Sequence, residues 1–189
     1  MPWQGGLMKL RARVLAGLIT VASPALSQTA PAPAREQSLP AIILKVGSTF
    51  SIGLSNSGEL DTKGGAAQPL RPYDLEFIRK LVTEHSDATG ANGAIIDISL
   101  PAPAIEKSHL RFSFVPIDDG RQTVLVVENG FPTSFLYRAR IGRGSNSQVT
   151  DVCQLIPNKR GYEHWPYAID SIEITDIHPV EWTGNLRCE

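Results

Sequence analysis

The chain has 189 residues, of which 18 are basic and 19 are acidic. Lys9, Arg11 and Arg13 lie in the signal peptide that is predicted below. Its removal leaves 15 basic against 19 acidic side chains, a net charge of −4. A mildly acidic protein lacks the excess of lysine and arginine with which general nucleic-acid binders neutralise phosphates, so that class is excluded.

The first residues have the features of a secretory signal peptide. An apolar run at residues 14–22 follows the basic residues, and Ala25 and Ser27 are small residues of the kind that a signal peptidase reads before Gln28. The apolar run is about half of the roughly 20 residues that a membrane span needs. We therefore predict a signal peptide over residues 1–27 and a periplasmic or secreted protein that does not span the membrane after cleavage.

Two further segments follow the predicted signal peptide. Residues 28–40 are rich in alanine and proline, and such a composition buries too little apolar surface to offset the entropy cost of ordering it. We expect a flexible leader there. Residues 41–189 are enough for one β-rich domain with one core.

The domain opens with two β-prone runs at residues 41–46 and 49–54, which predict a hairpin, and with a surface loop at residues 60–68. One helix is expected next, because Pro72 suits a first helical turn. Its apolar residues have helical spacing and predict one buried face, which would cover a sheet or an open end. These residues are Leu75, Ile78, Leu81, Val82 and His85.

The remaining patterns are those of strands. Runs at residues 94–100, 110–114, 148–156 and 169–177 predict one strand each, and in the last run Ile172 and Ile174 share a face with Asp170 and Asp176. We expect residues 123–141 to be the centre of the fold. They predict two strands folded back on each other across Asn129-Gly130. The apolar run at residues 124–127 suits a strand that is covered on both faces, whereas residues 135–141 alternate between the two faces.

Several short strands, one helix and many glycine and proline turns favour an antiparallel arrangement, since a parallel sheet would need alternating helices. The sequence thus predicts a mostly β fold, an antiparallel β-sandwich or open barrel with one amphipathic helix.

Cys153 and Cys188 are the only cysteines. An even pair in an exported protein tends to close in the oxidising compartment, so we predict a disulfide between them. A redox-active pair is disfavoured, because redox motifs need close spacing and an activated thiolate.

The densest chemistry lies in residues 159–167, where aromatic and polar side chains crowd a connection rich in proline and glycine. Aromatic faces beside polar groups could bind a sugar ring or cap a ligand groove. The alternative is that Trp165 and a tyrosine plug the end of a sandwich while Glu163 bonds a loop backbone. The candidate residues of this segment are Tyr162, Glu163, His164, Trp165 and Tyr167.

A second candidate site is basic. Arg138 and Arg140 share a strand face, and with Arg143 they could clamp an anionic ligand through paired guanidinium groups. Lys159 and Arg160 add to this run of positive charge. The alternative is a solvated face whose arginines pair with the acids Glu163, Asp170, Glu173 or Asp176.

No catalytic residue, cofactor or metal site is predicted. His85, His109, His164 and His178 are scattered without metal-ligand spacing. No Gly-x-Ser-x-Gly elbow is present, so a hydrolase could exist only through an arrangement that the sequence does not reveal.

Three short segments resemble small exported proteins of unknown function from Proteobacteria. They are Leu136-Tyr137-Arg138-Ala139, Val152-Cys153 and Glu163-His164-Trp165-Pro166. The resemblance implies export and a shared β-rich fold, and it carries no catalytic residue.

We therefore expect a non-enzymatic periplasmic or secreted domain that binds an envelope component or a protein partner. The alternatives are a glycan-binding module that uses Trp165 and its neighbouring tyrosines, and a hydrolase with an unrecognised site.

Overall fold

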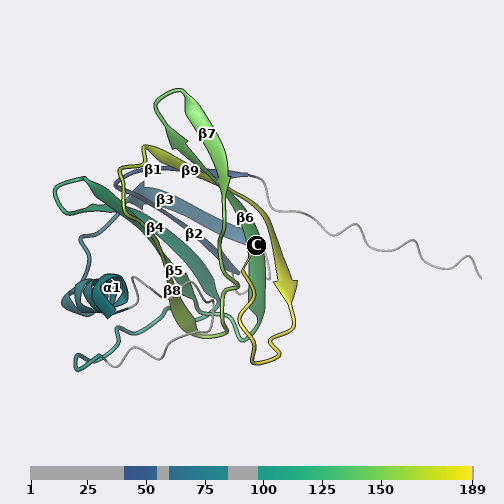
Figure 1. The fold of residues 1–189 in the computed structure, drawn as a ribbon. Coiled ribbons are helices and arrows are strands. Elements are labelled where there is room, and N and C mark those ends of the chain that lie inside the picture. Colours follow the sequence, from purple (N-terminus) through teal and green to yellow (C-terminus); the bar gives the residue numbers. More distant parts are fainter. Residues whose placement is uncertain (1–40, 55–59, 85–97, 189) are drawn as a thin grey trace, which may run out of the picture. The chain divides into compact units, whose positions relative to one another are not determined.

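The computed structural model describes residues 41–54, 60–84 and 98–188. Within these ranges the strands form two antiparallel sheets, and the helix α1 (Pro72–Glu84) lies beside one of them (Figure 1). The four-stranded sheet has the order β1 (Ile42–Lys45), β9 (Ser171–Val180), β6 (Ser134–Arg143) and β7 (Asn146–Thr150). The five-stranded sheet has the order β3 (Leu60–Ala66), β2 (Ser48–Leu54), β4 (His109–Ile117), β5 (Gln122–Asn129) and β8 (Lys159–Trp165).

The main core lies between the two sheets, where alternate residues of each strand face inward. A smaller apolar cluster lies on the opposite face of the five-stranded sheet, where Ile78 of α1 packs against Val124 and Val126 of β5. β5 is therefore buried on both faces, as its continuous apolar run predicted. The prediction of a β-sandwich with one helix is confirmed. The largest fully buried side chains of the main core are Leu110, Phe112, Phe114, Leu125, Tyr137, Ile172 and Ile174.

Residues 123–141 do not form the hairpin that the sequence predicted. β5 pairs with β4 and β8, whereas β6 pairs with β7 and β9, so the chain crosses from one sheet to the other between them. Asn129 stabilises the crossing, because its buried amide donates to the carbonyl oxygens of Thr133 and Ile156 at 2.8 and 3.1 Å. The chain thus passes from one sheet to the other at Asn129-Gly130. The asparagine side chain satisfies carbonyl groups that have no strand partner.

The predicted first hairpin is wrong for the same reason. A turn at Gly47, with φ of +82°, does separate β1 from β2. However, β1 pairs with β9, and β2 pairs with β3 and β4. The turn therefore joins the two sheets at their edge instead of joining partners within one sheet.

The boundaries of several other elements also differ from the sequence prediction. The expected loop at residues 60–68 contains β3, an edge strand held by the backbone ladder of β2. The expected connection at residues 159–167 contains β8. The expected strand at residues 148–156 ends with β7 at Thr150 and continues only as isolated bridges.

Three predictions fall wholly or mainly on residues that the structure does not describe. The signal peptide and the leader lie outside the described ranges, and so does most of the strand expected at residues 94–100. Its described part, residues 98–100, is not a strand.

A bulge in β9 changes the face that its last residues present. Leu136 pairs with His178 and Arg138 with Thr175, so β9 carries one extra residue at this point. Asp176 lies in this bulge with φ of +51° and is exposed, whereas Ile177 is buried. Asp176 therefore leaves the face of Ile172 and Ile174 on which strict alternation had placed it.

Helix α1 is present as predicted but is rotated about its axis. Leu75 and Val82 are exposed, whereas Asp74 and Ile78 are buried against the five-stranded sheet. The face that meets the sheet therefore includes a carboxylate, which hydrophobic spacing alone assigned to solvent. This rotation creates the most distinctive chemical feature of the molecule.

Candidate functional site

A charged cluster is buried between α1 and the five-stranded sheet. Arg160 of β8 bonds to Asp74 of α1 at 2.9 Å and to Glu128 of β5. The side chains of Arg160, Asp74 and Glu128 are only 7, 6 and 8% exposed. Because each buried ion loses several kcal/mol of hydration, the three groups depend on one another for compensation.

The start of the helix positions the Asp74 carboxylate. Pro72 occupies the first helical position, and the side chain of Asp74 accepts the backbone N–H of Arg71 at 3.2 Å, which is half of a capping box. The other oxygen of Asp74 accepts the hydroxyl of Tyr162 at 2.6 Å. Burial raises the pKa of Tyr162, and the bond to Asp74 raises it further, so this hydroxyl stays protonated as a donor.

Two more arginines converge on Glu128 from the solvent side. Arg111 of β4 contacts Glu128 at 3.1 Å, and Arg71 contacts it at 3.4 Å. Arg111 also pairs with Glu106 at 2.5 Å. One buried carboxylate is therefore shared by three guanidinium groups, and two of them remain partly open to solvent, with side-chain exposures of 34 and 47%.

Arg160 lines two hollows, which we call together the Arg160 cleft. The first, the polar hollow, has a volume of about 250 Å³ and is lined by both donor and acceptor side chains. The second, the aromatic hollow, has a volume of about 410 Å³. The polar side chains of the first are Thr49, Gln68, Arg71, Asp74, Arg111, Ser113, Glu128 and Arg160, and the lining of the second includes Tyr73, Phe77, Pro103, Ile105, Lys107, Lys159 and Tyr162.

The aromatic hollow combines an apolar wall with a positive rim. Phe77 and Tyr162 stack with ring centroids 4.4 Å apart and an interplanar angle of 21°. Lys107 and Lys159 are exposed at its edge, and neither forms an ion pair with any residue of the described ranges. The Nε of Arg160, which lines both hollows, is buried and has no hydrogen-bond acceptor within the described residues.

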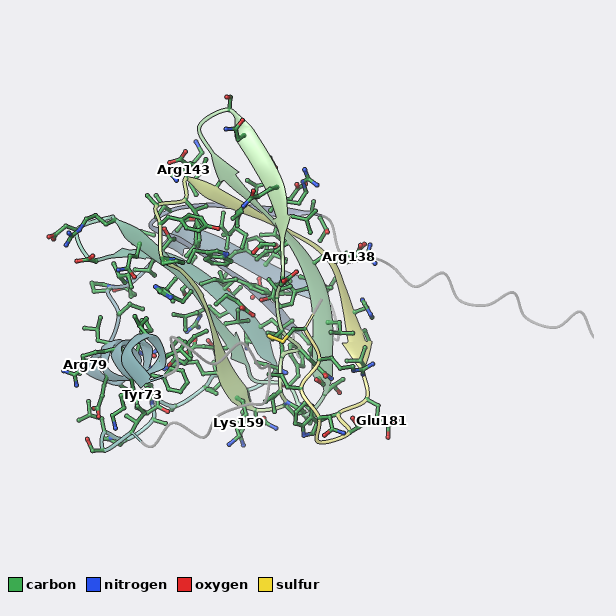
Figure 2. The ribbon with its side chains drawn as sticks, in the orientation of Figure 1. Tyr73, Arg79, Arg138, Arg143, Lys159 and Glu181 are labelled. Atoms are coloured by element: carbon green, nitrogen blue, oxygen red, sulfur yellow. A yellow bond between two sulfur atoms is a disulfide. The ribbon has the colours of Figure 1, made fainter. Side chains whose placement is uncertain are left out.

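A third hollow, the hairpin hollow, lies away from this cleft. It has a volume of about 350 Å³ and is formed by the β6–β7 hairpin and the connection between β8 and β9. Tyr167 and Ile169 line it together with Arg143, Asn146 and Gln148. Figure 2 shows Arg143 near this hairpin, on a different part of the molecule from Tyr73 and Lys159.

The structure divides the predicted basic site. Arg138 and Arg140 lie on the outer face of the four-stranded sheet, where Arg138 is 70% exposed and pairs with Asp176 at 3.7 Å. Arg140 lies opposite Glu173 in the ladder. The arrangement matches the solvated face that the sequence offered as the alternative, and Arg143 lies apart in the hairpin hollow.

The predicted aromatic site is divided by the alternation of β8. Tyr162 and His164 point to the helix side of the sheet, where His164 contacts Gln122 at 2.7 Å and burial lowers its pKa. Trp165 points into the main core, is 6% exposed and donates its indole N–H to Thr150. Glu163 also faces inward. The five residues thus contribute to three separate environments.

Glu163 lies beside the disulfide, which joins Cys153 to Cys188 as predicted. Its carboxylate accepts the backbone N–H of Cys153 at 2.8 Å, which confirms the expected bond to a loop backbone. Burial raises the pKa of Glu163 to about 7, although the bond from Cys153 opposes the rise. The pKa of the buried Tyr137 hydroxyl is also raised, by burial and by the nearby Glu163 carboxyl.

Sequence reasoning missed most of the Arg160 cleft. It named Tyr162, Lys159 and Arg160, but it did not name Asp74, Glu128 or Arg111. One signal was present, because Asp74 lies in the first turn of a helix two residues after Pro72, a position where a carboxylate commonly bonds backbone N–H groups.

Among the residues that the structure describes, no cluster of three or more histidine, cysteine or acidic side chains could hold a metal ion. No helix within the same ranges has the length and apolar character needed to cross a bilayer.

Comparisons with known proteins give no relative from which a function could be transferred. No protein-family model, no curated protein and no solved structure matches the chain.

Proposed function

We propose that the chain is an exported, non-enzymatic binding domain whose ligand occupies the Arg160 cleft. The observation that carries the proposal is the pair of lysines at the rim, Lys107 and Lys159, which have no ion-pair partner among the described residues beside an apolar, aromatic-lined hollow. Convergent polar groups beside an apolar wall are the usual composition of a binding site. The ligand is an envelope component or a protein partner that carries negative charge next to an apolar group.

The charged cluster beneath the cleft supports binding rather than catalysis. Asp74 and Glu128 are only 6 and 8% exposed, and both bond to Arg160. The cluster instead joins α1 to β5 and β8 and so fixes the walls of both hollows. A rigid, preorganised wall lowers the entropy cost of binding.

Export is supported by the disulfide between Cys153 and Cys188, a bond that persists in oxidising compartments. The arrangement of the first residues as a signal peptide gives the same indication. Mass spectrometry of the exported protein should find Gln28 at its N-terminus, and retention of residues 14–22 would contradict this part of the proposal.

Capture from an envelope extract tests the proposed site. We expect the tagged, processed protein to retain at least one component of the extract. The double variant Lys107→Gln/Lys159→Gln should retain at least tenfold less of that component. The matched control Lys45→Gln/Lys63→Gln removes the same charge from β1 and β3 and should retain the component. Equal capture by both variants would show that the lysines of the cleft do not hold the ligand.

The hairpin hollow supports a second candidate function, glycan binding. Asn146, Gln148 and Arg143 line this hollow together with Tyr167, and their planar polar groups can bond sugar hydroxyls. A glycan array should then report binding that Tyr167→Ala abolishes and Lys107→Gln/Lys159→Gln does not affect.

A further inference from the structure

The chemistry of the Arg160 cleft narrows the class of its ligand, and the inference drawn here rests on the proposed function. We infer that the cleft binds an acidic peptide segment of a partner protein. An apolar side chain of that segment lies in the aromatic hollow, and its neighbouring carboxylates bind Lys107 and Lys159.

The aromatic hollow defines the side chain that it receives. Its apolar lining includes Tyr73, the stacked pair Phe77 and Tyr162, and the residues Pro103 and Ile105. A volume of about 410 Å³ is that of a small ligand site. Aromatic and proline side chains pack well against such walls, because rings attract one another beyond the burial of their area.

The two lysines at the rim of the aromatic hollow determine the charge that its ligand should carry. Lys107 precedes β4 and Lys159 begins β8, so two different segments place a positive group at the same hollow. Neither lysine forms an ion pair with a described residue, whereas three arginines of the neighbouring polar hollow share Glu128. Charge complementarity therefore calls for carboxylates on the ligand next to the apolar group.

The polar hollow favours a peptide over a lipid. It continues the cleft past Arg160 and offers hydroxyls from Thr49 and Ser113 together with guanidinium and carboxylate groups. Mixed donors and acceptors suit the amide groups of a peptide backbone and not an acyl chain. The processed chain also has a net charge of −4, which gives no general attraction to an anionic membrane surface.

The buried Nε of Arg160 adds an independent indication. It is a donor without an acceptor among the described residues, and it belongs to a side chain that is only 7% exposed and lines both hollows. An unpaired buried donor costs free energy, and an acceptor brought by a ligand would offset that cost. This atom has almost no accessible surface, so a backbone carbonyl of the ligand can accept from it only when the Arg160 side chain turns toward one of the hollows.

Peptide selection tests the inference. A phage library of random seven-residue peptides is selected on the purified protein, on Lys107→Gln/Lys159→Gln and on Lys45→Gln/Lys63→Gln. We expect the wild type and the second variant to enrich peptides with an acidic residue within two positions of an aromatic residue or proline. Synthetic versions, measured by fluorescence anisotropy, should bind Lys107→Gln/Lys159→Gln at least tenfold more weakly, and their affinity should fall with added salt.

Three results would overturn the inference: no enrichment, enriched peptides without acidic residues, and equal affinity for both variants. Thermal melts check that both variants are folded. If peptides fail but the lysine-dependent capture from envelope extract remains, the proposed function stands and the ligand is of another class. Vesicles of phosphatidylglycerol then identify a lipid by the same lysine dependence. If neither capture nor peptide binding depends on the lysines, the proposed function fails as well.

Discussion

The two outer faces of the sandwich place arginine in opposite environments. On the five-stranded sheet, α1 covers Arg160, whose side chain is 7% exposed and bonds two buried carboxylates. On the four-stranded sheet, Arg138 is 70% exposed and has one distant partner at 3.7 Å. Both side chains project from a strand. The covering helix therefore decides whether an arginine forms buried ion pairs that stabilise the fold or remains exposed to solvent.

The largest expected effect comes from removing the covered arginine. Arg160→Met leaves Asp74 and Glu128 buried with fewer partners, so we expect the free energy of unfolding to fall by about 3 to 5 kcal/mol. Urea unfolding measures the change, and Arg140→Met on the open face is the control. A loss within about 1 kcal/mol of the control would show that the two faces do not differ energetically.

Glu163, which has no basic partner among the described residues, should behave in the opposite way to the arginine cluster. The pKa of Glu163 is raised to about 7 in the folded protein from an ordinary value of 4.5. The folded state therefore holds the proton more tightly than the unfolded chain does. The stability from this group is fully present below pH 4.5 and is lost as the pH rises to about 7.

The free energy at stake in this titration is about 3 kcal/mol. Glu163→Gln keeps an acceptor for the Cys153 N–H and should remove this part of the pH dependence. Unfolding free energies of the wild type and the variant at several pH values give the difference directly. Parallel curves for the two proteins would refute the assignment.

A smaller effect is expected from a single hydrogen bond in the covered face. Tyr162→Phe keeps the stack on Phe77 and removes only the hydroxyl that donates to Asp74 at 2.6 Å. We expect a loss of about 1 to 2 kcal/mol, since the acceptor is a buried carboxylate. The control is Tyr73→Phe in α1, the helix that carries Asp74. It removes a hydroxyl that bonds no described residue and should leave the melting temperature nearly unchanged.

The smallest effect should come from the open face. Arg138→Gln/Arg140→Gln removes two exposed charges and should change the free energy of unfolding by less than about 1 kcal/mol. Thermal melts test this. A loss of several kcal/mol would mean that these arginines belong to a buried network, and the contrast between the two faces would then disappear.

Local patterns predicted the strands better than their partners. The apolar run in β5 and the alternation in β6 follow from residue order, and both were predicted. Which strands pair is decided by contacts between distant segments, so the sequence wrongly paired β5 with β6 and β1 with β2. A turn such as Asn129-Gly130 reverses the chain equally well within a sheet or between two sheets.

The candidate site was harder to predict, for a related reason. Residues 162–167 looked like one cluster because they are consecutive, but a strand sends neighbours to opposite faces. Tyr162 and Trp165 are therefore separated by the sheet itself. The partners of Arg160 come from α1 and β5, and no local pattern links a helix rotation to a strand that follows much later in the chain.

The pairing of β1 with β9 has a consequence for how the domain is assembled. The first strand of the described domain finds its partner in the last, with Ile42 opposite Ile174. The four-stranded sheet therefore cannot be completed until almost the whole domain has been synthesised, and such distant pairing is slow to form. The C-terminal end of the domain is held elsewhere, because Cys188 bonds to Cys153 between β7 and β8. The two ends of the domain are therefore fixed to different segments, and reduction of the disulfide should release the last residues without opening the pairing of β1 with β9.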